Sequence, residues 1–125
     1  MRRCAWIHAG AMDEITKLQA EVLKVLASPR RLEILHRLAE GPLEVGRIAQ
    51  ELERSQPNVS QHLAVMRAAG IVEADRDGRE IRYRLADPDV LVACSVMRGV
   101  LERRLARLAR AADSARMPDL LVPVS

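Results

Sequence analysis

The chain has 125 residues, of which 49% are hydrophobic, 30% are charged and 2% are aromatic, and its formal net charge is +3 at pH 7. This length and apolar content predict one globular domain and exclude a disordered chain. No apolar run is long enough to cross a bilayer and no signal-peptide core is present, so we expect a cytoplasmic protein with no membrane partner. The two aromatic residues, Trp6 and Tyr83, are too few to stack single-stranded bases.

The first predicted elements are an arm and a helix. Residues 1–12, which include Cys4, show no clear period, so we expect an N-terminal arm ahead of the folded domain. Asp13 can cap a helix by accepting a hydrogen bond from a free backbone N–H. Apolar residues then recur at helical spacing and predict an apolar helical stripe formed by Ile15, Leu18, Val22, Val25 and Leu26.

Two further helices are predicted before residue 53. Ser28 is a suitable N-cap for the first of them, and Pro29 fits its first turn, where the missing N–H costs no hydrogen bond. Residues 40–42 (EGP) predict its end. A short helix is then expected over residues 44–52, with an apolar side formed by Val45, Ile48, Ala49 and Leu52.

A fourth helix is predicted over residues 55–70, with Ser55 as its N-cap and Gly70 at its C-terminal end. Together with the preceding short helix and the tight turn between them, it forms a helix-turn-helix pattern. Its buried stripe, at four- and three-residue steps, is predicted to be Val59, Leu63 and Met66.

The other face of this fourth helix is polar but carries almost no fixed charge. The alternative interpretation is an ordinary surface helix, although a solvated face more often carries Lys and Glu. Gln and Asn side chains can pair with both edges of an adenine in the major groove, Ser can bond a base or a phosphate, and a helix N-terminus suits a phosphate. We therefore predict DNA contacts from Ser55, Gln56, Asn58, Ser60, Gln61 and His62, with Arg67 further along the helix.

After Gly70 the apolar period changes to two. Residues 71–76 and 79–85 are predicted strands, and Asp77-Gly78 between them is a strong hairpin signal. Apolar side chains alternate with Glu and Arg in the second strand, which predicts one buried face and one basic face. The alternative is an edge strand that its charges keep solvated. Beside a helix-turn-helix, we interpret the hairpin as a wing that reaches a phosphate backbone through Arg76, Arg79 and Arg82.

Asp87 and Pro88 predict the start of a long last helix, with Asp87 as its cap. An apolar stripe at near-heptad spacing runs along this helix and is longer than one small domain needs, so we predict dimerisation through the first and last helices. The folded domain is expected to span residues 13–117, ahead of a proline-broken tail at residues 118–125. The predicted interface residues are Ile15, Leu18, Val22, Val90, Cys94, Met97, Leu101 and Leu105.

Four linked motifs accompany this order of elements, at residues 26–35 (LASPRRLEIL), 55–63 (SQPNVSQHL), 70–72 (GIV) and 78–87 (GREIRYRLAD). They resemble the ArsR/SmtB family of bacterial winged helix-turn-helix repressors over roughly residues 23–101. The resemblance implies a mainly α fold with a β-hairpin wing, of class α+β, which dimerises through its first and last helices. It also implies a homodimer that represses transcription from a palindromic operator in double-stranded DNA. A metal ion, a metalloid or an oxidant commonly acts as the inducer in this family.

The sensing sites of that family are not intact in this sequence. A Cys-x-Cys pair at the start of the helix-turn-helix would fall on Glu44 and Gly46, so no thiol is present there. Of the four positions of the family's zinc site on the last helix, only the first matches. These positions are occupied by Asp87, Asp89, Val100 and Arg103.

The two cysteines, Cys94 on the last helix and Cys4 on the arm, are the remaining candidates for sensing. Thiolates prefer soft ions, so they suit a thiol-bound metal or metalloid, and a pair of thiols can also be oxidised to a disulfide. Alternatively, Cys94 is a small hydrophobic residue in the dimer interface, and the regulator has no small inducer. A winged-helix module that binds protein without DNA is a further alternative. No phosphate-binding loop or serine elbow is present, so we do not expect an enzyme.

Overall fold

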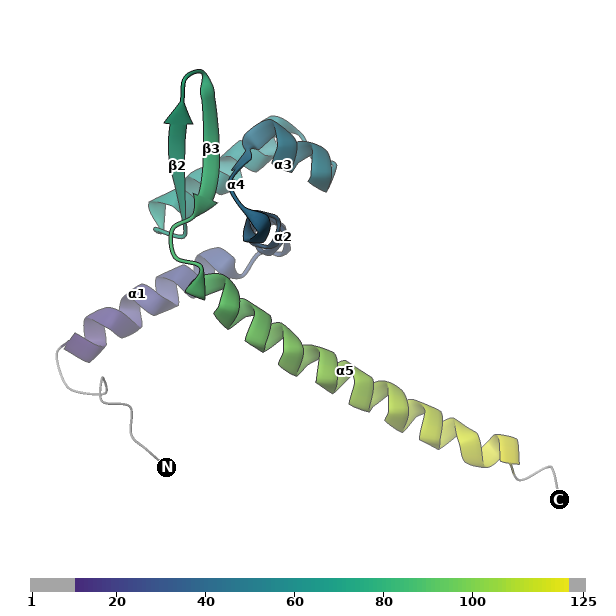
Figure 1. Cartoon of the computed structure of the whole chain (residues 1–125). Coiled ribbons are helices and arrows are strands. Elements are labelled where there is room, and N and C mark those ends of the chain that lie inside the picture. Colours follow the sequence, from purple (N-terminus) through teal and green to yellow (C-terminus); the bar gives the residue numbers. More distant parts are fainter. Residues whose placement is uncertain (1–10, 122–125) are drawn as a thin grey trace. The chain divides into compact units, whose positions relative to one another are not determined.

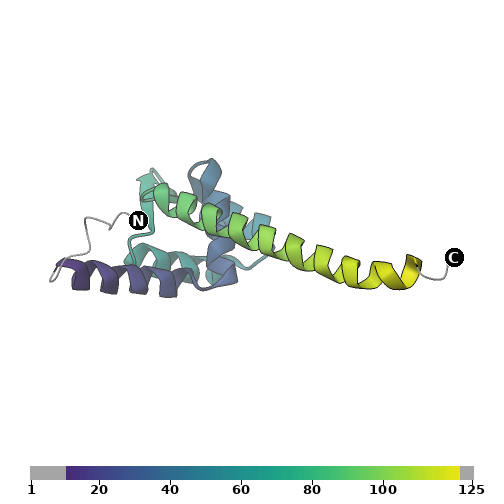
Figure 2. The ribbon, with the colours of Figure 1, turned by 90° about the horizontal axis from the view of Figure 1, so that it is seen from below.

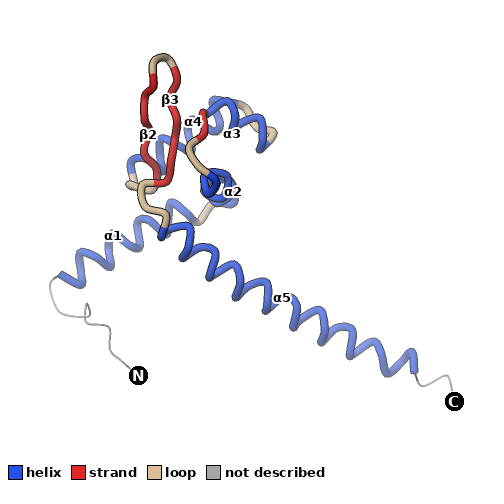
Figure 3. The backbone as a smooth tube through the Cα atoms, viewed as in Figure 1, coloured by secondary structure: helices blue, strands red, loops and turns tan. Residues whose placement is uncertain are grey.

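The computed structural model describes the backbone of residues 11–121 and the side chains of residues 13–116. Two compact units make up the chain, with the boundary after Pro88 (Figures 1 and 3). The first unit holds four helices, a short 3-10 helix and three strands, and the second is a single helix. The elements are α1 (Ala11–Leu26), α2 (Pro29–Arg37), η1 (Leu38–Glu40), β1 (Leu43–Glu44), α3 (Val45–Leu52), α4 (Gln56–Ala68), β2 (Val72–Asp77), β3 (Glu80–Leu85) and α5 (Asp89–Leu121).

Helix α1 begins at Ala11, so the prediction that Asp13 caps it is wrong. Asp13 lies instead in the first turn beside Glu14, where carboxylates interact favourably with the positive end of the helix dipole. Ala11 and Met12, which we assigned to the arm, belong to the helix, and residues 1–10 lie outside the described residues.

Helix α2 begins as predicted. Ser28 has extended backbone angles, and its Oγ accepts a hydrogen bond from the backbone N–H of Arg31 at 3.4 Å. Pro29 occupies the first helical turn. The helix tightens into η1 and stops at Gly41, whose φ of +139° favours glycine. The chain therefore leaves α2 where the EGP motif predicted its end.

The hydrophobic core lies in the first unit. Val59, Leu63 and Met66 have no exposed surface, which confirms the predicted buried stripe of α4. The chain turns at the end of α4 through Gly70, whose φ is +76°. The other fully buried large side chains come from α2, α3 and the start of β2, and they are Ile34, Leu35, Ile48, Ile71 and Val72.

The three strands form an antiparallel sheet in the order β1-β3-β2. Strand β1 was not predicted, because two residues are too few to show a period. The hairpin turn is also displaced by one residue from the prediction: Asp77 pairs with Glu80, so Gly78 and Arg79 are its two central residues. Gly78 has φ +65°, and glycine at the first central position suits a type II′ turn.

Helix α5 is a single continuous helix of 33 residues (Figure 2). It begins at Asp89, after the predicted cap at Asp87, and it extends to Leu121. The prediction that the tail from residue 118 lacks structure is therefore wrong for residues 118–121, which continue the helix although Pro118 is among them. No helix within residues 11–121 is both long and apolar enough to cross a membrane.

Candidate DNA interface

The N-terminal half of α4 presents an exposed polar surface. Ser55 Oγ accepts a hydrogen bond from the backbone N–H of Asn58 at 3.2 Å and so caps the helix. Pro57 lies in the first turn, as predicted. Beyond this cap, Gln56, Ser60 and Gln61 are exposed. Their side chains combine two amides and a hydroxyl on a helix whose opposite side is fully buried.

Two other predicted contact residues do not share this exposed surface. Asn58 and His62 are half-buried, and the Oδ1 atom of Asn58 is buried without a hydrogen-bond partner among the described residues. The Nδ1 atom of His62 accepts a hydrogen bond from Arg31 Nε on α2 at 3.1 Å. His62 follows Val59 by three residues, which places it beside the buried stripe. His62 is therefore engaged with α2, whereas Gln61 beside it is exposed.

The surroundings of His62 favour its neutral form. Burial lowers its pKa from the ordinary value of 6.5, and the positive charges of Arg31 and Arg30 lower it further. A neutral imidazole that accepts a hydrogen bond at Nδ1 carries its proton on Nε2. The pKa shift and the hydrogen bond from Arg31 therefore agree.

One face of the sheet is acidic, contrary to the predicted basic face. The strand register places Glu73 opposite Arg84, Asp75 opposite Arg82 and Asp77 opposite Glu80, and residues directly opposite each other share a face. Glu44 of β1 also lies opposite Arg82. Five carboxylates therefore surround the two guanidinium groups on this face. A pattern read along β3 alone missed this acidic character because four of the five carboxylates belong to its two neighbouring strands.

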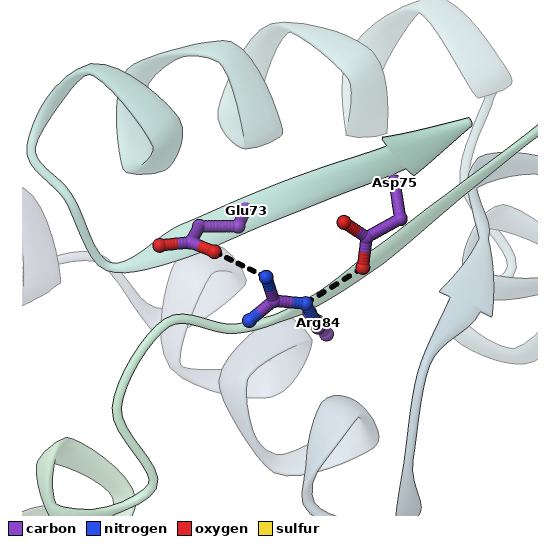
Figure 4. Close-up of polar contacts among 3 residues, drawn as sticks. All are labelled: Glu73, Asp75 and Arg84. Carbon is purple, nitrogen blue, oxygen red and sulfur yellow. Dashed lines mark hydrogen bonds and ion pairs between the residues drawn. The ribbon is translucent and has the colours of Figure 1, made fainter.

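Arg84 forms ion pairs with two carboxylates on this acidic face (Figure 4). Its Nε donates to Asp75 at 2.6 Å, and its Nη2 pairs with Glu73. The hydrogen bond to Asp75 raises the pKa of Arg84 above its ordinary value. Arg82 lies 3.5 Å from Glu80, so it also has an acidic neighbour along its own strand. The positive charges of Arg82 and Arg84 are therefore both compensated by nearby carboxylates.

The tip of the hairpin holds the other predicted cations. Arg76 lies opposite Ile81, on the face away from the carboxylates, and Arg79 is in the turn. Both are exposed, and neither forms an ion pair with a residue in the described part of the chain. Arg67 is exposed in the last turn of α4. Of the predicted cations, Arg76, Arg79 and Arg67 are therefore the ones whose charge is exposed and not paired within the described residues.

The predicted sensing residues do not form a metal centre in the part of the chain that can be assessed. Cys94 is half-buried on α5 and has a free thiol, and Cys4 lies outside the described residues. Between residues 11 and 121, no group of three or more His, Cys, Asp or Glu side chains is arranged to hold a metal ion.

Solved structures share this arrangement of helices and wing. A homodimeric winged helix-turn-helix DNA-binding domain from Mycobacterium bovis matches with a TM-score of 0.71 and 31% identity, over 79% of this chain and 92% of that one. The crystal structure of Rv0081 from Mycobacterium tuberculosis matches with a TM-score of 0.67 and 41% identity, over 74% of this chain and 93% of that one. The fold and the exposed helix α4 define a winged helix-turn-helix protein.

Sequence relatives identify the family. The profile described as "Bacterial regulatory protein, arsR family" matches residues 28–74. The HTH-type transcriptional repressor SmtB of M. tuberculosis is 42% identical over 84 residues, which cover 67% of this chain and 62% of that repressor. Rv0081, an uncharacterized HTH-type transcriptional regulator, is 40% identical over 94 residues, which cover 74% of this chain and 82% of that protein. The chain belongs to the ArsR family of bacterial transcriptional regulators, a family of regulators and not of enzymes.

Proposed function

We propose that this chain is a sequence-specific transcriptional repressor that binds a palindromic operator in double-stranded DNA as a homodimer, in the cytoplasm. The observation that carries the proposal is the two-sided character of α4. Val59, Leu63 and Met66 anchor one side of the helix in the core, while Gln56, Ser60 and Gln61 are exposed on the other. A rigidly held helix with exposed amides is suited to reading base edges in a major groove.

The proposed base contacts come from the exposed residues alone. Gln56 and Gln61 can each pair with the major-groove edge of an adenine, and Ser60 can bond a base or a phosphate. Ser55 lies at the positively polarised end of α4, which suits a phosphate. Asn58 and His62 are left out of this set, because both are half-buried and His62 is bonded to Arg31.

The proposed phosphate contacts of the wing are Arg76 and Arg79. Phosphate binding by a protein cation is favourable because it releases counterions from the DNA, and a cation already paired with a carboxylate contributes less. Arg82 shares its face with Glu44, Asp75 and Glu80, so it is not among the proposed phosphate contacts. Arg67, on α4, remains a candidate for a phosphate further along the groove.

Dimerisation is supported by exposed apolar residues on both predicted interface helices. On α1, Ile15 and Leu18 are exposed, and on α5 the stripe includes Leu101 at 49% and Leu105 at 66% exposure. Apolar stripes of this length rarely stay in water. The related M. bovis domain is homodimeric. Two copies of this chain would place their α4 helices about 34–36 Å apart, in successive major grooves.

Release from the operator by a thiol-reactive inducer is the finer part of the proposal. A soft metal ion, arsenite or an oxidant has the chemistry to react with the half-buried thiol of Cys94. Cys94 lies within the apolar stripe of α5, so modification there would disturb the packing of the proposed dimer. Cys94→Ser is expected to abolish release by such agents, and release that persists in this variant would exclude Cys94 as the sensor.

Selection of bound duplexes from a random-sequence DNA pool tests the function as a whole. We expect the wild-type protein to enrich a sequence with two-fold symmetry, and a gel shift to show tighter binding to that duplex than to a scrambled duplex of the same composition. A protein-interaction module would enrich no sequence. Enrichment without symmetry would contradict the homodimer but not DNA binding.

A further inference from the structure

At the junction between α1 and α2, the backbone carbonyl of Val25 lacks its usual helical donor. Within a continuous helix, the carbonyl of Val25 would accept a hydrogen bond from the residue four positions later. That residue is Pro29, which has no N–H. The Nη1 atom of Arg31 instead donates to Val25 O at 3.1 Å. A side chain of α2 therefore completes the last turn of α1.

The same guanidinium also bonds the side of α4. Arg31 Nε donates to His62 Nδ1 at 3.1 Å, so one planar group on α2 joins the end of α1 to α4. The backbone N–H of Arg31 is bonded to Ser28 Oγ, which holds the start of the side chain in place. The neighbouring Arg30 makes no such link, because it pairs with Glu33 on its own helix at 2.7 Å.

We propose that Arg31 is a positioning residue for DNA recognition, which sets the rotation of α4 relative to the end of α1 by holding His62 and the Val25 carbonyl at once. This inference rests on the proposed function. The buried stripe of α4 holds the helix against the core, but hydrophobic contact is non-directional and tolerates small rotations of a helix about its axis. A hydrogen bond to a half-buried imidazole is directional, and it lies one residue from Gln61, a proposed base contact.

The proposal gives the predicted dimer interface a direct connection to the DNA-reading surface. Helix α1 carries Ile15 and Leu18, two of the predicted interface residues, and its last turn is bonded to Arg31. A displacement of the end of α1 would therefore be passed to α4 through the hydrogen bonds of Arg31. Arg31 contributes by orienting Gln61 and its neighbours, and not by contacting DNA itself.

The test compares Arg31→Lys with Arg30→Lys as the matched control. A lysine keeps the positive charge, but its single nitrogen cannot occupy the positions of Nε and Nη1 together. Affinity is measured against the symmetric duplex enriched by the wild-type protein and against its scrambled counterpart, over a range of salt concentrations. We expect Arg31→Lys to weaken binding to the enriched duplex about tenfold, as for the loss of a charge-assisted hydrogen bond, and to leave scrambled-duplex binding and the salt slope unchanged. Arg30→Lys should behave as wild type.

Variants of His62 test whether the effect runs through that residue. His62→Gln retains a hydrogen-bond acceptor for Arg31 and should stay within about threefold of wild type on the enriched duplex, whereas His62→Leu should lose about as much as Arg31→Lys. The double variant Arg31→Lys/His62→Leu should be no weaker than the worse single variant, because both remove the same bond. Circular dichroism and thermal unfolding identify a temperature at which every variant is folded.

Two results would overturn the inference. Binding of Arg31→Lys to the enriched duplex within about twofold of wild type would show that the two hydrogen bonds of Arg31 have no positioning role. An equal loss on both duplexes, with a salt slope reduced by about one, would mean that Arg31 contacts a phosphate directly. Failure of the wild-type protein to distinguish the two duplexes would instead refute the proposed function, so the two failures are distinguishable.

Discussion

Asp75 on β2 accepts a hydrogen bond from Arg84 Nε on β3 at 2.6 Å, and Glu73 pairs with the other end of the same guanidinium. This relationship changes the electrostatics of the wing. A strand that reads as basic in isolation becomes part of an acidic face once its neighbours are paired with it. The positive charge that can meet a phosphate is then confined to the tip, at Arg76 and Arg79.

Removal of the tip charge should weaken DNA binding without changing sequence preference. Arg79→Ala is expected to lower affinity for all duplexes alike and to reduce the salt slope by about one, because one phosphate contact is lost. Arg82→Ala is the control and should leave the slope unchanged, since Arg82 lies among carboxylates. Gel shifts or fluorescence anisotropy at several salt concentrations measure both. Equal slopes for the two variants would contradict the assignment of the contact to the tip.

Removal of an exposed amide from α4 should relax sequence preference. Gln61→Ala is expected to cost about 1–3 kcal/mol of discrimination at the base pair that it contacts, because a two-bond amide contact is lost. The measurement is selection from a random pool with each variant, followed by affinities on single-base substitutions of the enriched duplex. Gln19→Ala, which removes an exposed amide from α1, is the control. An unchanged base preference in Gln61→Ala would exclude this residue as a reader.

Stability should fall at acidic pH through His62. Its pKa is lowered in the folded protein, first by burial and then by the charges of Arg31 and Arg30. Between this lowered pKa and the ordinary value, the unfolded chain therefore binds more protons than the folded protein does. The stabilising contribution is complete above the ordinary value of 6.5 and is lost as the pH falls through the lowered folded-state pKa.

Urea unfolding from about pH 7.5 to about pH 5 measures this dependence. His62→Gln cannot titrate and should show a smaller loss of unfolding free energy than wild type over the same range. His36→Gln is the control variant, and it should retain the part of the loss that depends on His62. Identical curves for wild type and His62→Gln would contradict the assignment.

A charge placed in the apolar stripe of α5 should dissociate the dimer. Leu105→Glu introduces a carboxylate at a position that is 66% exposed in one copy and is predicted to be buried between two. Sedimentation velocity should show a shift from dimer to monomer. Arg110→Glu lies on the opposite side of the helix and should remain dimeric. A dimer in both variants would exclude this stripe as the interface.

Most of the helices could be predicted because their signals are local. Ser28 and Ser55 cap the helices that were assigned to them, and Val59, Leu63 and Met66 are buried as their spacing indicated. Such patterns depend on the 3.6-residue period and on backbone groups within one turn, which are properties of adjacent residues. The helix ends were less predictable, and α1 and α5 both extend beyond their expected bounds. In α5 the helix continues past Pro118, a residue that usually ends a helix, so the stop signal in the sequence was misleading.

The candidate site was predicted only in outline. The sequence identified α4 as the polar helix, but it could not separate Gln61, which is exposed, from His62, which faces Arg31. That distinction depends on where α2 lies, and Arg31 precedes His62 by 31 residues. The two-residue strand β1 was missed for a related reason, since its identity comes from pairing with β3.

The amino-acid order alone determined the helix-turn-helix, its buried stripe and the hairpin, because each of these is specified by the spacing of neighbouring residues. The tertiary structure decided which charges remain available and which polar groups face inward. Arg84 is paired with carboxylates 9 and 11 positions away, and the pKa of His62 is lowered by burial and by the charges of Arg31 and Arg30 on another helix. Electrostatic and hydrogen-bond partners are set by distance in space, which a one-dimensional pattern does not contain.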